Sequence, residues 1–322
     1  MGGKVTTLEL EPLVTVILTT YNSERYLAET LDSLIAQTYD NMEIVVVDNL
    51  SVDKTEKIVK GYGEAIKFRK ADRPCMLAEA RNLGISETNG KYIAFLDSDD
   101  TWYPQKIAKQ VAFMEAHPEV PLCHTYCHVI DAHSVVQYVR HEGNLPGTGT
   151  SYHKLLRHNF ITISSAMVRR SVLDQIGITF PCDPQRDTTG EDNLFFLLLA
   201  RKHPVGLVDE VLCTYRIHGD SACDRFGWKI RPENVLVSRN ILHSPRYWRG
   251  IAERAEVRDA LIEACWTNCI YWRDRGHWKR ALYFVLVGLQ EAPAARQMWG
   301  QLLKSLGKSC LSLFRKGVPV HG

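Results

Sequence analysis

The chain has 322 residues, of which 45% are hydrophobic and 24% are charged, and its formal net charge is +2. This composition is ordinary for a soluble globular protein, and no run approaches the roughly 18 consecutive apolar residues of a membrane-spanning helix. Met1–Leu10 lacks the apolar core of a secretory signal, and nine irregularly spaced cysteines are typical of reduced thiols. We therefore expect a cytoplasmic protein.

Apolar, β-branched runs alternate with helical patterns along the first hundred residues. The runs that predict strands are Val14–Leu18, Met42–Val47, Ile66–Phe68 and Tyr92–Leu96. Between them, one helix is predicted with Asn22 or Ser23 as its cap and with its apolar face at Leu27, Leu31, Leu34 and Ile35. Further helices are predicted for about 54–61 and 78–87. Strands that are apolar throughout are typical of a parallel α/β sheet, in which ligands bind at the carboxyl ends of the strands.

Three carboxylates, Asp97, Asp99 and Asp100, follow the fourth predicted strand within four positions. Like charges this close repel one another, so the cluster suggests a hard cation such as Mg²⁺ or Mn²⁺. An isolated Asp-Ser-Asp-Asp is equally compatible with a turn that caps the next helix. Because Tyr21 and Asp48 end neighbouring predicted strands, we favour the functional interpretation.

Other nucleotide and metal motifs fit the sequence poorly. Neither a G-x-G-x-x-G fingerprint nor a Walker lysine loop follows the first predicted strand. Seven histidines between His117 and His158 include the pairs Cys123-His124 and Cys127-His128, which suggest zinc. However, Leu122–Ile130 alternates like a strand, and no second ligand pair has zinc-site spacing. We favour core or acceptor-cleft histidines.

Several short motifs occur in a fixed order between Thr15 and Ser221. They are Val16–Asn22, Glu43–Asp48, Ala80–Gly84, Asn89–Asp100, Ser164–Val168, Gly190–Asp192 and Tyr215–Gly219. In this order they resemble family 2 glycosyltransferases with the GT-A fold, over about two thirds of the chain. The resemblance implies an α/β fold with a mostly parallel, Rossmann-like sheet, to which this chain adds a C-terminal helical extension.

The resemblance also implies roles on the donor side of a nucleotide-sugar site. Asp99 resembles the main ligand of Mg²⁺ or Mn²⁺, and Asp97 or Asp100 would contact the ribose or assist the metal. Tyr21 resembles the residue that stacks on the base, Thr19 lies beside it, and Asp48 would accept a hydrogen bond from uracil or thymine. Arg81 would face the base or the diphosphate, with a surface helix charge as the alternative.

On the acceptor side, Asp192 resembles the general base that activates the acceptor hydroxyl. Glu191 and Asp192 precede a buried helical run, and a helix N-terminus favours ionised carboxylates, although ordinary N-capping explains them as well. His218 resembles the residue that closes over the diphosphate or completes the metal shell, with a structural histidine as the alternative.

Two features depart from the family. The usual Asp-Asp-Gly-Ser after the second strand is Asp48-Asn49-Leu50-Ser51 here, which puts the ribose contact and the turn shape in doubt. The Q-x-x-R-W signature of processive synthases is absent, so the enzyme is expected to add one sugar at a time. The resemblance implies inverting, hexosyltransferase-like transfer from a UDP- or dTDP-sugar to a hydroxyl of a glycan or lipid-linked acceptor, in cell-surface polysaccharide biosynthesis. Alternatives are a non-catalytic sugar-nucleotide-binding partner and a nucleotidyltransferase.

We expect an N-terminal tail at 1–11, a catalytic domain at 12–232 and a helical region at 233–322. From Glu233 onward, 14 Lys and Arg residues oppose 7 Asp and Glu residues. The segment from Ala264 to Pro293 resembles one tetratricopeptide-like helix pair. From Trp299 to Lys316, apolar residues segregate from basic ones, which is typical of a helix that lies on an anionic membrane surface, with a docked helix as the alternative. No nucleic-acid partner is expected.

Overall fold

The computed structural model describes residues 11–177, 179–182, 190–219, 233–243, 251–291, 299–300 and 304. It divides into two compact units, which are described separately. The first unit comprises Met1–Tyr152, Phe160–Pro184 and Glu191–Ser221, and the second comprises His153–Asn159, Gln185–Gly190 and Ala222–Gly322.

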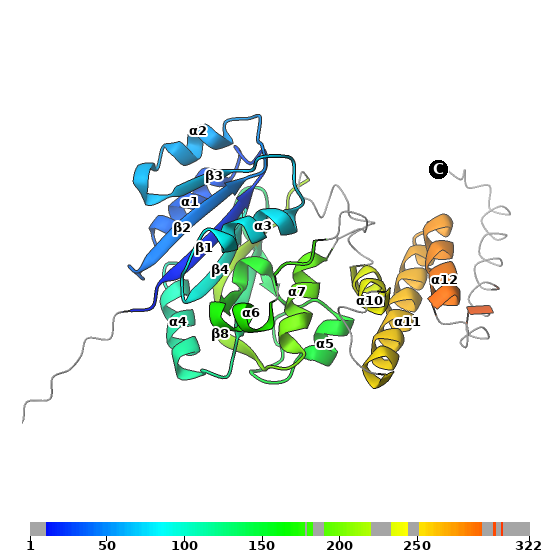
Figure 1. The fold of residues 1–322 in the computed structure, drawn as a ribbon. Coiled ribbons are helices and arrows are strands. Elements are labelled where there is room, and N and C mark those ends of the chain that lie inside the picture. Colours follow the sequence, from blue (N-terminus) through cyan, green and yellow to red (C-terminus); the bar gives the residue numbers. More distant parts are fainter. Residues whose placement is uncertain are drawn as a thin grey trace, which may run out of the picture. The chain divides into compact units, whose positions relative to one another are not determined.

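Within the described residues, the first unit is built on an eight-stranded mixed sheet (Figure 1). The strands are β1 (Val14–Thr20), β2 (Met42–Asp48), β3 (Lys67–Lys70), β4 (Tyr92–Asp97), β5 (Leu122–Ile130), β6 (Val136–Arg140), β7 (Met167–Arg169) and β8 (Val205–Arg216). Their order is β3-β2-β1-β4-β7-β5-β6, and β8 pairs with β5. The first four strands are mutually parallel, so their carboxyl ends meet at one edge of the sheet.

Helices cover both faces of this sheet because its central strands β1, β2 and β4 are apolar on both sides. The helices of the first unit are α1 (Leu27–Ile35), α2 (Thr55–Lys60), α3 (Leu77–Ser86), α4 (Lys106–Ala116), α6 (Arg170–Ile176) and α7 (Glu191–Ala200), with 3-10 turns η1 (Gly63–Ala65) and η2 (Ile163–Ser165). Leu31 of α1 and Met114 of α4 share a core with Val16 of β1, whereas Ala80 of α3 packs with Val45 of β2 on the other face. Strands β1, β2 and β4 are therefore buried from both sides, as their composition predicts.

The predicted cap of α1 is wrong. The helix begins at Leu27, and the backbone oxygen of Ser23 accepts hydrogen bonds from the amides of Tyr26 and Leu27. Asn22 has a φ of 49°, and its Oδ1 accepts a hydrogen bond from the amide of Val52. The Asn22 side chain thus fixes the segment that follows β2 and does not start a helix.

The second unit is helical throughout the parts described. Its helices are α5 (Tyr152–Arg157), which starts in the first unit, α10 (Glu233–His243), α11 (Ile251–Asp274) and α12 (Trp278–Glu291). Helices α11 and α12 pack on each other and are joined through Gly276, whose φ is 78°. The indole of Trp299 is buried and occupies the space that a Cβ on Gly288 would need. The rest of the predicted amphipathic helix lies outside the described residues, apart from Gly300 and Lys304.

No helix in the described part of the chain combines the length and the apolar character that crossing a bilayer requires.

Candidate active site

The acidic loop lies where sequence analysis predicts it, at the carboxyl end of β4. Asp97 is the last residue of β4 and pairs with Thr19 of β1 in the parallel register. The amide of Asp100 donates to the carbonyl of Asp97 at 3.2 Å, so the loop closes as a tight turn. The carboxyl groups of this turn are consequently held next to the end of β1, at the edge where ligands bind in such sheets.

Ser164, the first residue of the Ser164–Val168 motif, holds the acidic loop in place. Its hydroxyl donates to Oδ2 of Asp100 at 2.5 Å and accepts a hydrogen bond from the amide of Asp97 at 3.2 Å. Its carbonyl accepts a hydrogen bond from the indole of Trp102 at 2.7 Å. A serine suits this position because its buried hydroxyl both donates a hydrogen bond to Asp100 and accepts one from the amide of Asp97.

Asp100 is buried, and both of its carboxylate oxygens have hydrogen-bond partners. Besides Ser164 on Oδ2, the amide of Arg216 donates to Oδ1 at 2.8 Å. Burial, reinforced by the charges of Asp99 and Asp97, raises the pKa of Asp100 well above its ordinary value. These contacts connect β4, η2 and β8, and the predicted role of Asp100 as a metal ligand stays a prediction.

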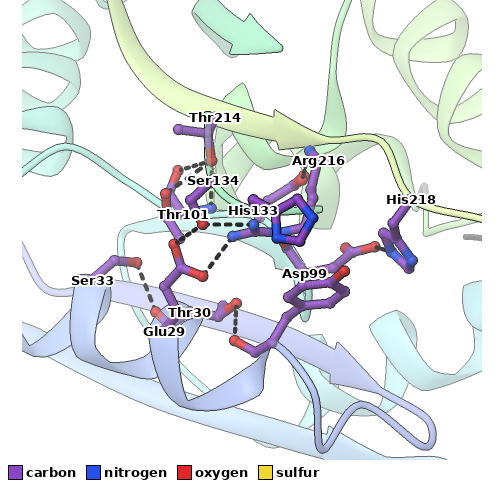
Figure 2. Close-up of polar contacts among 12 residues, drawn as sticks. Glu29, Thr30, Ser33, Asp99, Thr101, His133, Ser134, Thr214, Arg216 and His218 are labelled. Atoms are coloured by element: carbon purple, nitrogen blue, oxygen red, sulfur yellow. Dashed lines mark hydrogen bonds and ion pairs between the residues drawn. The ribbon is translucent and has the colours of Figure 1, made fainter. Parts of the chain in front are cut away.

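Asp99 and His218 face each other, and Figure 2 shows the imidazole beside the carboxylate. Nε2 of His218 lies 2.9 Å from Oδ2 of Asp99, whereas Nδ1 of His218 is buried and, among the described residues, has no hydrogen-bond partner. Burial and the neighbouring charge of Asp97 raise the pKa of Asp99, and His218 opposes this effect. A carboxylate and an imidazole therefore converge from two elements that are about 120 residues apart in sequence.

Arg81 connects the acidic loop to the second acidic pair. The guanidinium is 3% exposed, and its Nη2 lies 3.0 Å from Oδ1 of Asp97 while its Nη1 lies 2.8 Å from Oε1 of Glu191. Burial works against the cation, but Asp97, Glu191 and Asp192 outweigh it, so the pKa of Arg81 is raised. The alternative of a surface helix charge is wrong.

Glu191 and Asp192 begin α7 with different surroundings. Glu191 pairs directly with Arg81, yet burial raises the pKa of Glu191 to about 7. The guanidinium of Arg81, 2.8 Å away, opposes this rise in pKa and favours the ionised form of Glu191. Oδ1 of Asp192 accepts a hydrogen bond from the amide of Asn193, and burial raises the pKa of Asp192 as well.

The segment 48–51, where the sequence departs from the family, is held by its own hydrogen bonds. Asp48 is buried, and its carboxylate accepts hydrogen bonds from both the amide and the hydroxyl of Ser51. Asn49 uses its amide in both directions, because Nδ2 donates to the carbonyl of Cys75 at 2.7 Å and Oδ1 accepts from the Cys75 amide at 2.9 Å. Leu50 has a φ of 62° and adopts the left-handed conformation that glycine adopts without strain.

The remaining predicted nucleotide contacts lie on β1 and just beyond it. Thr19 is buried in β1 between Val47 and Asp97, while Tyr21 is 57% exposed immediately after the strand. An exposed aromatic ring at the carboxyl end of β1 is available to stack on a flat ligand. The structure thus places Thr19, Tyr21, Asp48 and the acidic loop at the same edge of the sheet.

Comparison with known proteins decides the family. The model of glycosyl transferase family 2 matches residues 15–177, which include β1 and the acidic loop. An uncharacterized glycosyltransferase of Rickettsia felis is 31% identical over 72% of this chain.

The chain belongs to glycosyl transferase family 2.

The relatives differ in how much of their own length the match covers. The Escherichia coli protein WfaP, named UDP-Glc:alpha-D-GlcNAc-diphosphoundecaprenol beta-1,3-glucosyltransferase, is 29% identical over 71% of this chain and 87% of its own length. The Rickettsia felis relative is longer, and the match spans only 38% of its length. Matches to two other Rickettsia glycosyltransferases each span 31% of those proteins.

Solved structures show the GT-A fold predicted from sequence. TarS residues 1–349 of Staphylococcus aureus, in complex with UDP-GlcNAc, aligns with a TM-score of 0.64 at 19% identity, over 96% of this chain and 93% of that one. The mannosyltransferase PcManGT of Pyrobaculum calidifontis, in complex with GDP-Man and Mn²⁺, aligns with a TM-score of 0.59 at 17% identity, over 96% of this chain and 89% of that one.

Sequence analysis of this family 2 chain missed residues whose role depends on tertiary contacts. Arg216 lies inside the Tyr215–Gly219 motif, but its contacts with the acidic loop could be seen only once β8 was placed beside β5. Ser164 was likewise part of a motif without an assigned role. In both cases the motif supplied the signal, and the fold supplied the partner.

Proposed function

We propose that this chain transfers a single sugar from a UDP- or dTDP-sugar to a hydroxyl of a glycan or lipid-linked acceptor, with inversion at the anomeric carbon. The observation that carries the proposal is the salt-bridge chain from Asp97 through Arg81 to Glu191, which joins the acidic loop to the start of α7. A donor-side and an acceptor-side group must lie near one another for direct displacement, and this chain of contacts supports that requirement.

Asp99 and His218 are the residues that we propose to hold Mg²⁺ or Mn²⁺. A carboxylate oxygen and an imidazole nitrogen suit Mn²⁺, and the buried Nδ1 of His218 has no hydrogen-bond partner among the described residues, so the ring offers a second nitrogen as a ligand. Among the described residues, no group of three or more metal-ligating side chains occurs, so donor diphosphate oxygens and water would fill the other positions. The cation would neutralise charge on the leaving diphosphate. We assign Asp100 to anchoring the loop, since both its oxygens are engaged.

The protein's own groups supply the remaining chemistry. Tyr21 would stack on the base, Asp48 would accept a hydrogen bond from its N–H, and Thr19 would line the same edge. Asp192 would accept the proton of the acceptor hydroxyl, because its raised pKa makes the carboxylate a better base. Arg81 ties down Glu191, which leaves Asp192 as the base of the pair.

An acceptor linked to a lipid is supported by the name of WfaP, which acts on a diphosphoundecaprenol-linked sugar. Such an acceptor would suit an enzyme of cell-surface polysaccharide biosynthesis that works at the inner face of the cell membrane. We therefore propose a cytoplasmic protein with peripheral membrane contact.

The test is binding of UDP with and without Mn²⁺, measured by calorimetry for the native chain and for Asp99→Asn. Native protein should bind UDP at least tenfold more tightly with Mn²⁺, and Asp99→Asn should lose this gain while its melting temperature stays within a few degrees. The matched control is Asp72→Asn, which removes an exposed carboxylate that pairs with Arg69. Equal UDP affinity with and without Mn²⁺ in the native protein would contradict the metal site.

A further inference from the structure

Arg216 ends β8, two residues before His218, and it is 1% exposed. A guanidinium taken out of water destabilises a fold unless its donors are satisfied and its charge is compensated. Each nitrogen of this side chain donates a hydrogen bond, and the partners come from three separate elements of the first unit.

The inner contacts of Arg216 are with the acidic loop. Its backbone amide donates to Oδ1 of Asp100 at 2.8 Å, and its Nε donates to the carbonyl of Asp99 at 2.7 Å. The first contact ties the end of β8, and hence His218, to the loop. The second holds the backbone of the residue whose carboxylate faces His218 (Figure 2).

The outer contacts of Arg216 form a closed ring. Nη2 donates to Oε2 of Glu29 at 2.8 Å, Nη1 donates to Oγ of Ser134 at 2.8 Å, and Oγ of Ser134 donates to Oε1 of Glu29 at 2.8 Å. Figure 2 shows the guanidinium between these two side chains, which come from α1 and from the turn between β5 and β6. Ring closure fixes the direction of the guanidinium, because neither outer partner can move without the other.

Tyr26 completes the arrangement. Its ring lies under the guanidinium, 4.5 Å from Cζ of Arg216, and 4.8 Å from the imidazole of His218. The aromatic face therefore supports the cation and limits the movement of the histidine at the same time.

We propose that Arg216 is a positioning residue that sets Asp99 and His218 in the arrangement needed to bind a divalent cation together with a nucleotide diphosphate, and that Glu29 and Ser134 hold Arg216 in place. The inference rests on the proposed function, since it concerns the same metal site. The inference adds Arg216, a residue that touches neither the cation nor the donor but sets the distance between Asp99 and His218, the two protein ligands of the cation.

The experiment compares Arg216→Lys with the native chain, using UDP and Mn²⁺ as probes. Lysine keeps the positive charge, but it cannot donate to Asp99, Glu29 and Ser134 at once. We expect UDP affinity without metal to stay within twofold, and Mn²⁺ affinity in the presence of UDP, measured from the paramagnetic resonance of free Mn²⁺, to fall at least tenfold. Raising Mn²⁺ tenfold should restore UDP affinity in Arg216→Lys but not in Asp99→Asn.

The matched control is Arg170→Lys. Arg170 also donates several hydrogen bonds, but they go to the carbonyls of Gly90 and Ile85 and to the hydroxyl of Thr88, away from the acidic loop. The Arg170→Lys variant should have a lower melting temperature than the native chain, and its Mn²⁺ affinity should stay within twofold of the native value. A general loss of stability would therefore not imitate the predicted result.

A second variant keeps the test decisive if Arg216→Lys does not fold. The double change Glu29→Gln and Ser134→Ala releases the outer end of the guanidinium and leaves Arg216 itself in place. Mn²⁺ affinity should fall at least threefold. Native Mn²⁺ affinity in the double variant, or in a folded Arg216→Lys, would overturn the role of Arg216 alone. A native chain without Mn²⁺-dependent UDP binding would overturn the metal site and this inference together.

Discussion

At the scale of single residues, neighbouring carboxyl groups of the site differ in their hydrogen-bond and ion-pair partners. Arg81 forms ion pairs with Asp97 and Glu191, whereas Asp192, next in sequence to Glu191, accepts a hydrogen bond from the amide of Asn193. Adjacent carboxylates with different partners are the arrangement from which acid–base roles are assigned.

Replacement of Asp192 by Asn should therefore separate catalysis from binding. We expect UDP affinity with Mn²⁺ to stay within twofold, and turnover to fall by roughly a hundredfold or more, as when a general base is removed. Release of UDP from the donor sugar that best stabilises the fold, in the presence of acceptor, measures the effect. The matched control, Glu191→Gln, should keep more activity than Asp192→Asn, and the reverse order would move the base to Glu191.

Leu50 offers a test of backbone strain. A non-glycine residue at positive φ costs roughly 1–2 kcal/mol, so Leu50→Gly should raise the free energy of unfolding by about 1 kcal/mol. Leu50→Ala is the control, because it removes the same side-chain atoms beyond Cβ and keeps the strain. Urea denaturation of the native chain, Leu50→Gly and Leu50→Ala measures the free energy of unfolding of each. The explanation would be contradicted if Leu50→Gly were no more stable than Leu50→Ala.

At the scale of elements, α4 begins with a buried lysine. Nζ of Lys106 donates to Oε1 of Gln110 at 2.7 Å and lies 3.9 Å from the ring centre of Trp102. Burial lowers the pKa of Lys106 to about 8, although the nearby thiols of Cys213, Cys123 and Cys127 oppose this. The ammonium therefore destabilises the fold at neutral pH relative to an uncharged side chain.

The pH dependence of stability follows from this shift. Between about pH 8 and 10.5 the unfolded chain keeps the Lys106 proton that the folded chain has released, so stability rises with pH in this window. Relative to Lys106→Met, the native chain should gain about 2–3 kcal/mol between pH 7 and pH 10. Both proteins carry the same cysteines, so the difference isolates Lys106, and a difference that does not change with pH would contradict the burial argument.

Sequence patterns predicted most of the parallel half of the sheet. The predicted strands overlap β1, β2, β3 and β4 because fully buried parallel strands consist of continuous apolar runs. The three-residue strand β7 carries too little pattern, and its pairing with β4 and β5 exists only in the folded sheet. For the same reason the sequence could not show that Ser164 and Arg216, from distant elements, hold the carboxylate of Asp100.

At the scale of the whole molecule, the two units carry different charge. The basic excess after Glu233 falls on the helical unit, and the predicted membrane-facing helix lies mostly outside the described residues. Trp299, at the start of that helix, is buried against Gly288, which favours packing for this one residue.

A chain truncated after Pro293 should keep UDP binding and lose sedimentation with anionic vesicles, because Thr19 to His218 supply every proposed donor contact. Binding of the full chain should weaken with salt, since charges are screened within about 8 Å at physiological ionic strength. Truncation also removes Trp299, so the control is Lys304→Gln with Lys308→Gln and Arg315→Gln, which changes only charge. If the full chain does not bind anionic vesicles at low salt, the predicted membrane role of this helix is wrong, and the helix packs on the protein instead.

The side chain of Asn49 has an evolutionary consequence. An aspartate here could accept from the amide of Cys75, but it could not donate to the Cys75 carbonyl, and its charge would face that oxygen at the 2.7 Å now spanned by a hydrogen bond. The acid that is usual in family 2 at this position is therefore not a neutral replacement in this background. We therefore expect a graft of the family's turn into this chain to destabilise the fold unless the segment around Cys75 is grafted with it.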